Sequence, residues 1–123
     1  MAIEHAKSGE VIDIAPFGSE QLVNHQSVAL FKSKDLEVIR LVMQAKALMP
    51  LHHVLGEITI QCIEGVFEVL TDHGSQVVRQ YQMLFLQGGE PHIVRAIDPC
   101  SILVTIALKQ NQLAKNLDAN DHK

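Results

Sequence analysis

Short apolar segments separated by turn residues recur from residue 27 to residue 108, and this recurrence limits the possible folds more than any other feature of the chain. The segments repeat at spacings of about 8 to 12 residues, which is typical of all-β sandwiches and barrels. In the segment Leu36 to Val42, apolar and polar side chains alternate, as they do in a strand with one buried face. Helical spacing is hard to find before Lys109. The sequence therefore predicts an all-β domain.

Turn signals divide this region into the expected strands. Pro50 cannot donate a hydrogen bond to a strand ladder, so we expect residues 47–50 to close the second strand. The expected turns lie at residues 33–35, 64–65, 72–75, 87–91 and 98–99. The expected strands are residues 28–30, 36–42, 57–63, 66–70, 76–82, 83–86, 92–97 and 101–108.

The flanks of this region are less regular. Residues 1–26 are predicted to form an N-terminal arm with a short strand near Val11 to Ile14, and residues 27–108 the barrel. Residues 109–123 are predicted to be a tail or one short C-terminal helix, because helix formers surround Leu113, Ala114 and Leu117 before the sequence becomes polar. A chain of 123 residues fits one such domain.

Charge and composition argue against several classes of partner. The net charge is −4 and the isoelectric point is about 5.9, with no basic cluster that would bind nucleic acid or an anionic membrane surface. The apolar runs fall short of the roughly 18 residues that a membrane-spanning helix needs. The first residues carry no apolar signal region, so we expect a cytoplasmic protein. Cys62 and Cys100 lie outside any CxxC spacing and are expected to be buried thiols.

The stretch Leu51 to Gly65, LHHVLGEITIQCIEG, holds most of the residues with chemistry to offer. It combines His52 and His53 with Glu57, and imidazole nitrogen together with carboxylate oxygen suits Zn, Mn, Fe or Ni. The sequence therefore points to a divalent transition metal as a cofactor.

The run LHHVLGEITIQCIEGVFEV, followed by MLFLQGGEPHIVRAI and SILVTIAL, resembles the small single-domain cupins over residues 28–108. The resemblance implies a double-stranded β-helix, or jelly roll. It also implies two motifs, of patterns G(x)5HxH(x)3-4E(x)6G and G(x)5PxG(x)2H(x)3N, which supply a metal site of three histidines and one glutamate.

His92 is the best carry-over from the second motif. Gly89, two further residues and His92 match GxxH, although Gln87 stands in place of the proline, Tyr81 in place of the leading glycine and Ala96 in place of the asparagine.

The first motif departs further, because the adjacent pair His52–His53 replaces HxH. Counting back from Gly65 places the first motif histidine on His52 and keeps one ligand. Counting from Glu57 places the second motif histidine on His53 and keeps two. Consecutive strand residues face opposite sides, so only one of the pair can point inward unless the strand bulges.

The strand after the histidines has one polar face and one apolar face. Thr59 and Gln61 share a face with Glu57, while Ile58, Ile60 and Cys62 share the other. If the polar face lines the barrel, Gln61 and Glu57 are candidate ligands or substrate contacts; if the apolar face does, they face solvent or another subunit. The candidate metal ligands are His52, His53, Gln61 and His92, and the candidate pocket or rim residues are Glu57, Met43 and Phe85.

The resemblance does not assign a reaction, since one fold hosts many chemistries. Three functions stay open: a small-molecule-binding and metal-binding cupin, a metal-dependent enzyme of the dioxygenase, isomerase or decarboxylase type, and a module that senses a ligand without catalysis. We also expect a homodimer, because Ile39 and Leu41 are predicted to face outward as apolar surface and because small cupins commonly dimerise.

Overall fold

The computed structural model describes residues 5–52 and 55–108 of this chain. Within these residues, every strand falls inside the segment predicted as the barrel, and one turn of 3-10 helix, η1 (Leu22–Asn24), precedes them. The strands are β1 (Val28–Lys32), β2 (Leu36–Met43), β3 (Leu48–His52), β4 (Ile58–Glu64), β5 (Val66–Thr71), β6 (Gly74–Arg79), β7 (Met83–Leu86), β8 (His92–Ala96) and β9 (Cys100–Ala107).

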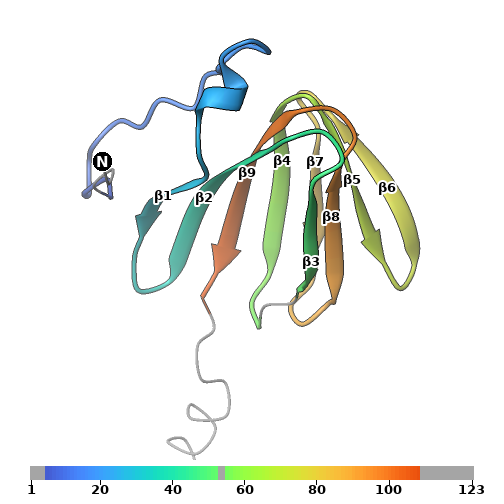
Figure 1. Ribbon diagram of the computed structural model, residues 1–123. Helices are drawn as coiled ribbons and strands as arrows, with labels where there is room; N and C mark the ends of the chain where they lie inside the picture. The colour runs from blue at the N-terminus through green and yellow to red at the C-terminus, as the bar shows by residue number, and fades with distance from the viewer. Residues whose placement is uncertain (1–4, 53–54, 109–123) are drawn as a thin grey trace, which may run out of the picture.

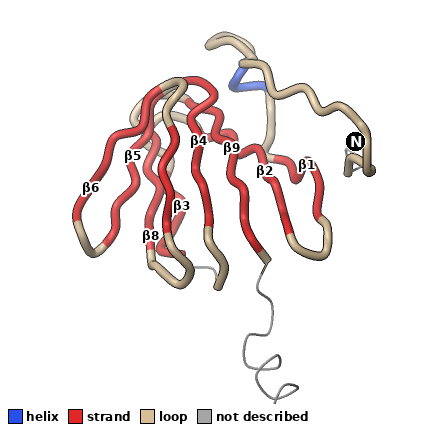
Figure 2. Tube along the Cα trace, turned by 180° about the vertical axis from the view of Figure 1, so that it is seen from behind, coloured by secondary structure: helices blue, strands red, loops and turns tan. Residues whose placement is uncertain are grey.

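The strands form two antiparallel sheets that face each other (Figure 1). One sheet has the strand order β1-β2-β9-β4-β7 and the other has the order β3-β8-β5-β6. Strands distant in sequence become neighbours, as β9 does between β2 and β4, and this is the connectivity of a jelly roll rather than of a meander. Figure 2 shows the same layers from behind, with the N-terminal arm on the side of β1 and β2. The predicted all-β double-stranded β-helix is confirmed.

Alternate residues of facing strands fill the space between the sheets. From the centre of the five-stranded sheet, β9 contributes Cys100, Ile102 and Val104, and the opposite sheet contributes Phe67 and Val94. Phe67 and Ile102 are both 0% exposed. Burying one large apolar side chain contributes about 1.5–3 kcal/mol, so contact between the sheets is the main source of stability.

The inner face of β2 differs from the prediction. Leu41 packs against the core and shares its face with the buried Met43, and Ile39 pairs with the core residue Val104. Ile39 and Leu41 therefore face inward, and the outward face of β2 carries Val38 and Arg40 instead. The alternation of this strand was predicted, but the face that fills the barrel is the one that carries Ile39, Leu41 and Met43.

The segment around Pro50 forms a strand that the sequence did not predict. The second strand ends at Met43, a turn follows, and β3 then pairs with β8 at the edge of the four-stranded sheet. The register shifts between Met49 and His52, so the strand bulges where Pro50 lies. Proline is tolerated on edge strands and at bulges because no ladder hydrogen bond is lost there.

The N-terminal arm lies along the outer face of the sheet without joining it. The short strand expected at Val11 to Ile14 does not form, and the arm instead places Leu22, only 1% exposed, in η1. The expected C-terminal helix falls on residues 109–123, outside the described part of the chain. In the described residues, no helix is long and apolar enough to cross a membrane.

Candidate functional site

His92 begins β8 and points toward the interior of the barrel. It shares the buried face of this strand with Val94 and Ala96 and is 2% exposed. The preceding turn packs closely on the start of β4, because a Cβ built on Gly88 would lie 2.3 Å from the carbonyl oxygen of Leu55. Glycine at this position lets the turn approach, and the turn places His92 at the barrel end where β3 stops and β4 starts. This end is called the mouth below.

A backbone group holds the His92 ring. Its Nδ1 lies 3.1 Å from the carbonyl oxygen of Glu90. In the tautomer that donates from Nδ1 to this carbonyl, the lone pair of the ring is on Nε2. A carbonyl that fixes the imidazole in this way is the usual second partner of a histidine that binds a metal or a polar ligand.

Strand pairing brings His52 to the register position opposite His92. Residues directly opposite each other in an antiparallel pair belong to the same face of a sheet. The bulge between Met49 and His52 supplies the shift of one residue that this pairing needs. His52 is therefore the member of the histidine pair that β3 brings to His92, while His53 lies outside the described residues.

Gln61 does not join this site. In β4 the apolar residues Ile58, Ile60 and Cys62 face the core, so Gln61 lies on the opposite side of the sheet, between Met83 of β7 and Leu103 of β9. The apolar face of this strand fills the barrel, because the facing sheet offers apolar side chains to pack against.

The three residues expected at the pocket or rim fall in different places. Met43 is buried in the core, and Glu57 is exposed just before β4, at the mouth. Phe85 pairs with Thr59 on the outer face and is 58% exposed, so it lines no interior pocket. Met83 of the same strand is exposed to the same degree. Met83 and Phe85 of β7 therefore lie on the outer surface of the sheet, as Gln61 does.

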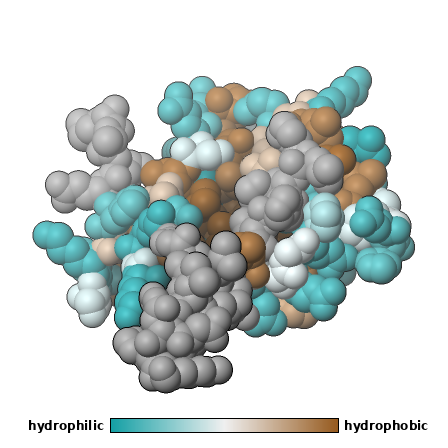
Figure 3. Space-filling view, turned by 90° about the horizontal axis from the view of Figure 1, so that it is seen from below, coloured by the Kyte–Doolittle hydropathy of each residue, from teal (hydrophilic) through white to brown (hydrophobic). Residues whose placement is uncertain are grey.

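The described residues do not form the site of three histidines and one glutamate that the motifs imply. Among the described residues, no group of three or more histidine, cysteine, aspartate or glutamate side chains is placed to hold a metal ion. His92 lies at the mouth, with His52 at the register position opposite it. Ile58 and Leu86 pair at the adjoining strand ends and are buried in the core, whereas Glu57 is exposed there. Figure 3 views this end and shows apolar side chains gathered between hydrophilic margins.

A second polar cluster, which sequence reasoning missed, fastens the arm to the outer face of the five-stranded sheet. Arg40 is 3% exposed; its Nε donates to Ser101 Oγ at 2.8 Å, and its Nη2 donates to the carbonyl oxygen of Ala15 at 2.7 Å. Burial lowers the pKa of the Arg40 guanidinium, and the nearby Glu64 carboxylate, 3.5 Å from Nη2, opposes that shift. The sequence offered one signal for this cluster, which is the charged Arg40 within the largely apolar strand LEVIRLVM.

Glu64 of β4 and Phe17 of the arm also belong to this cluster. The Glu64 carboxylate accepts the backbone N–H groups of Phe17 and Gly18 at 2.8 and 2.9 Å. The Phe17 ring lies 3.7 Å from the Arg40 guanidinium carbon and stacks on His25 at 3.6 Å. The arm is therefore bound through its backbone and through one aromatic ring.

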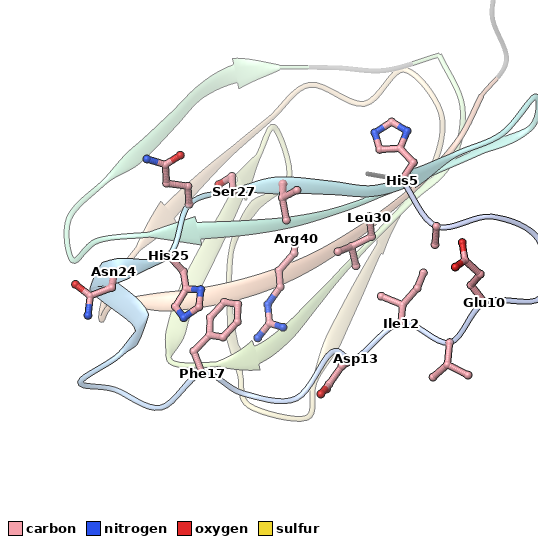
Figure 4. A pocket seen from close by; sticks show the side chains of 14 residues that line it. His5, Glu10, Ile12, Asp13, Phe17, Asn24, His25, Ser27, Leu30 and Arg40 are labelled. Carbon is pink, nitrogen blue, oxygen red and sulfur yellow. The ribbon is translucent and has the colours of Figure 1, made fainter. Parts of the chain in front are cut away.

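A cavity of about 820 Å³ separates the rest of the arm from the sheet (Figure 4). It lies on the outer face, so the five-stranded sheet separates it from His92. Its walls include Asp13, Phe17, His25, Val28, Leu30 and Arg40.

Comparisons with known proteins bear on the fold. No protein-family model matches the sequence, and no curated protein matches it. Solved structures do match. BH2720 from Bacillus halodurans superposes with a TM-score of 0.72 at 18% identity, over 88% of this chain and 87% of that one.

Two further matches are cupins by name. A cupin superfamily protein from Desulfitobacterium hafniense gives a TM-score of 0.65 at 12% identity, over 68% of this chain and 76% of that one. An RmlC-like cupin protein from Desulfovibrio desulfuricans gives 0.61 at 25% identity, over 84% and 97%. Together with the strand order, these matches show that the chain has the fold of a small cupin domain.

Proposed function

We propose that this protein binds a small organic molecule at the barrel mouth, with His92 and His52 as its polar anchors. The observation that carries the proposal is the placement of His92, which is buried on the interior face of β8 and opposite the register position of His52. A few polar groups within an otherwise apolar interior are the usual form of a ligand site.

The same two histidines suit a divalent metal of the Zn, Mn, Fe or Ni group. Two imidazoles fill only part of such an ion's coordination shell, which leaves positions for water or for the ligand itself. A small carboxylic acid would suit such an ion, because its carboxylate can occupy a position that the histidines leave open. The ion would supply Lewis acidity, and the chain would hold it through His92, whose ring the carbonyl of Glu90 orients, with His52 opposite in the register.

Metal titration tests the proposal. Untagged protein is stripped with a chelator and titrated with Zn²⁺ and Ni²⁺ by calorimetry, and bound metal is measured by elemental analysis. His92→Ala and His52→Ala should each weaken binding at least about tenfold, because each removes a ligand. Gln61→Ala and His73→Ala are matched controls, since Gln61 lies on the outer face and His73 is exposed, and both should bind as the wild type does.

The outcomes separate the three functions. Metal binding that His92→Ala leaves unchanged contradicts the site. A carboxylic acid that binds the loaded protein and is recovered unchanged supports a binding or sensing module. Turnover that disappears with the metal and returns with it supports the enzyme.

A further inference from the structure

The cavity under the N-terminal arm exists because the arm is fixed to the sheet at two separate places. At one end, the Ala6 N–H donates to the carbonyl oxygen of Leu30 at 2.9 Å. At the other end, Arg40 and Glu64 bind the backbone of residues 15–18. The hydrogen bonds of residues 7–14 stay within the arm. These residues therefore span the gap without bonding to the sheet, and the cavity of about 820 Å³ that they help to enclose has the usual size of a small-molecule site.

Strand β1 presents apolar side chains to this cavity from the side of the sheet. Val28 pairs with Arg40, so both residues belong to the outer face. The register of β1 and β2 shifts between Ala29 and Phe31, which leaves Leu30 as an extra residue in a bulge. Leu30 lines the cavity as Val28 does. Bulges are common next to active sites because they aim one side chain in a new direction.

The arm supplies the opposite wall of the cavity. Figure 4 shows Ile12 of the arm and Leu30 of β1 facing each other, and the Arg40 side chain reaching from β2 toward the arm. Ile12, Val28 and Leu30 are all half-buried. The cavity therefore has an apolar region between the arm and β1, next to a buried guanidinium.

Arg40 has one nitrogen left to donate to a ligand. Its Nε donates to Ser101 and its Nη2 to Ala15, and Nη2 also lies 3.5 Å from Glu64. Nη1 makes no hydrogen bond to a described residue. In the described chain, no side-chain nitrogen or oxygen is both buried from solvent and without a hydrogen-bond partner. Nη1 is therefore accessible to solvent, and it reaches solvent through the cavity that Arg40 lines.

The charges around Arg40 decide which kind of ligand this donor can take. Burial lowers the pKa of the Arg40 guanidinium, and the carboxylates of Glu64 and Asp13 both oppose that shift, so two negative charges already act on one positive charge. Asp13 also lines the cavity. A carboxylate ligand would add a third negative charge and would lose its water shell as well. The oxygen of an uncharged carbonyl group can accept the same hydrogen bond without that cost.

We propose that the cavity under the arm binds an uncharged organic molecule that has a carbonyl oxygen for Arg40 Nη1 and an apolar body for Ile12, Val28 and Leu30. Primary amides, ketones and esters of medium chain length have this chemistry. The five-stranded sheet separates this site from His92, so the proposal does not depend on whether the barrel mouth binds a ligand.

Nile red, an uncharged dye with a carbonyl group, tests the proposal on the full-length protein, because its fluorescence rises in apolar surroundings. The dye should bind saturably at one site per chain, and octanamide should displace it. Octanamide should compete at least about tenfold better than octanoate at pH 8, because octanoate must bring a charge into the cavity. Leu30→Trp places a larger side chain in the cavity and should raise the dissociation constant of the dye at least about tenfold.

Ile12→Glu is a second variant that spares the sheet, because Ile12 lies on the arm. It should weaken dye binding to a similar extent, and circular dichroism will verify that both variants fold. Ile14→Glu is the matched control, since Ile14 lies on the arm but does not line the cavity, and it should bind the dye as the wild type does.

Several results would overturn the proposal. One is that neither Nile red nor octanamide binds saturably, and another is that Ile12→Glu and Leu30→Trp bind the dye as the wild type does. Stronger competition by octanoate than by octanamide contradicts the uncharged ligand. Binding that is lost in Phe85→Ser or in His92→Ala also overturns the proposal, because the dye would then lie on the exposed face of β7 or at the barrel mouth.

Discussion

At the scale of single residues, the strongest polar network in the described chain lies far from the barrel mouth. Arg40 and Glu64 are both buried on the outer face, at 3% and 8% exposure, and three of their hydrogen bonds reach the backbone of the arm. A buried ion pair contributes little by itself, but losing one member leaves the other uncompensated. The pair therefore acts mainly to fix where the arm lies.

Replacing Arg40 tests this interpretation. Arg40→Met should lower the free energy of unfolding by about 3 kcal/mol, because it leaves the buried Glu64 carboxylate without its cation. Urea unfolding measures the change. Arg95→Met, which breaks the half-exposed pair with Glu68, is the control and should change stability far less. Equal losses in the two variants would contradict a special role for Arg40.

The two cysteines give a prediction about pH. Burial raises the pKa of Cys62 to about 11 and that of Cys100 to about 12, from an ordinary value near 9.0. Above pH 9 the unfolded chain loses thiol protons that the folded chain keeps, so the unfolded state binds fewer protons and stability falls as pH rises. The free energy of unfolding should be insensitive to these thiols below pH 8 and decline between pH 9 and 11.

A double Cys62→Ala, Cys100→Ala variant should lose this decline while being less stable overall, because both side chains lie in the core. In the native wild type at pH 8, a thiol reagent should find no fast-reacting cysteine, and both thiols should react after unfolding. One equivalent of fast reaction in the native state would show that one of the two is accessible.

At the scale of elements, the turn between β4 and β5 has little freedom to change. Gly65 has a φ of +85°, and a Cβ at this position would lie 2.2 Å from the carbonyl oxygen of Pro99 and 2.7 Å from the Cα of Cys100. Both contacts are with backbone atoms that begin β9. The Glu-Gly turn that the sequence predicted thus packs directly against the backbone that leads into β9.

Gly65→Ala should lower the free energy of unfolding by more than about 3 kcal/mol, since backbone strain and a backbone clash act together. Gly89→Ala isolates the strain, because Gly89 has a φ of +80° and nothing within 4 Å of its Cβ position. It should cost about 1 kcal/mol. Chemical denaturation compares the two, and similar costs would show that the β9 backbone moves aside without penalty.

Strand β3 shows where element prediction failed. Pro50 was expected to end a strand because proline has no N–H to donate to a ladder. This rule holds for strands that pair with a neighbour on both sides. β3 lies at a sheet edge and bulges at the proline, so the rule did not apply. Whether a strand will lie at an edge is decided by sheet order, which a local pattern does not contain.

At the scale of the whole molecule, the arm covers only one side of the outer face of the five-stranded sheet. Its backbone is bound by Arg40 of β2 and Glu64 of β4, whereas Met83 and Phe85 of β7 stay exposed. The barrel mouth is on neither surface.

The sequence by itself determined the β class, most strand limits and the turns at Gly65 and Gly89, because periodicity and turn chemistry are properties of neighbouring residues. The tertiary structure decided which face of β4 fills the barrel, which histidine stands opposite His92, and the burial of Arg40. Each of these depends on what a distant segment offers: an apolar sheet across from Ile60, a bulge in register with β8, and an arm whose backbone can pair with a guanidinium. A pattern along one strand shows that two faces differ, but the inward face is set by the partner that packs against it.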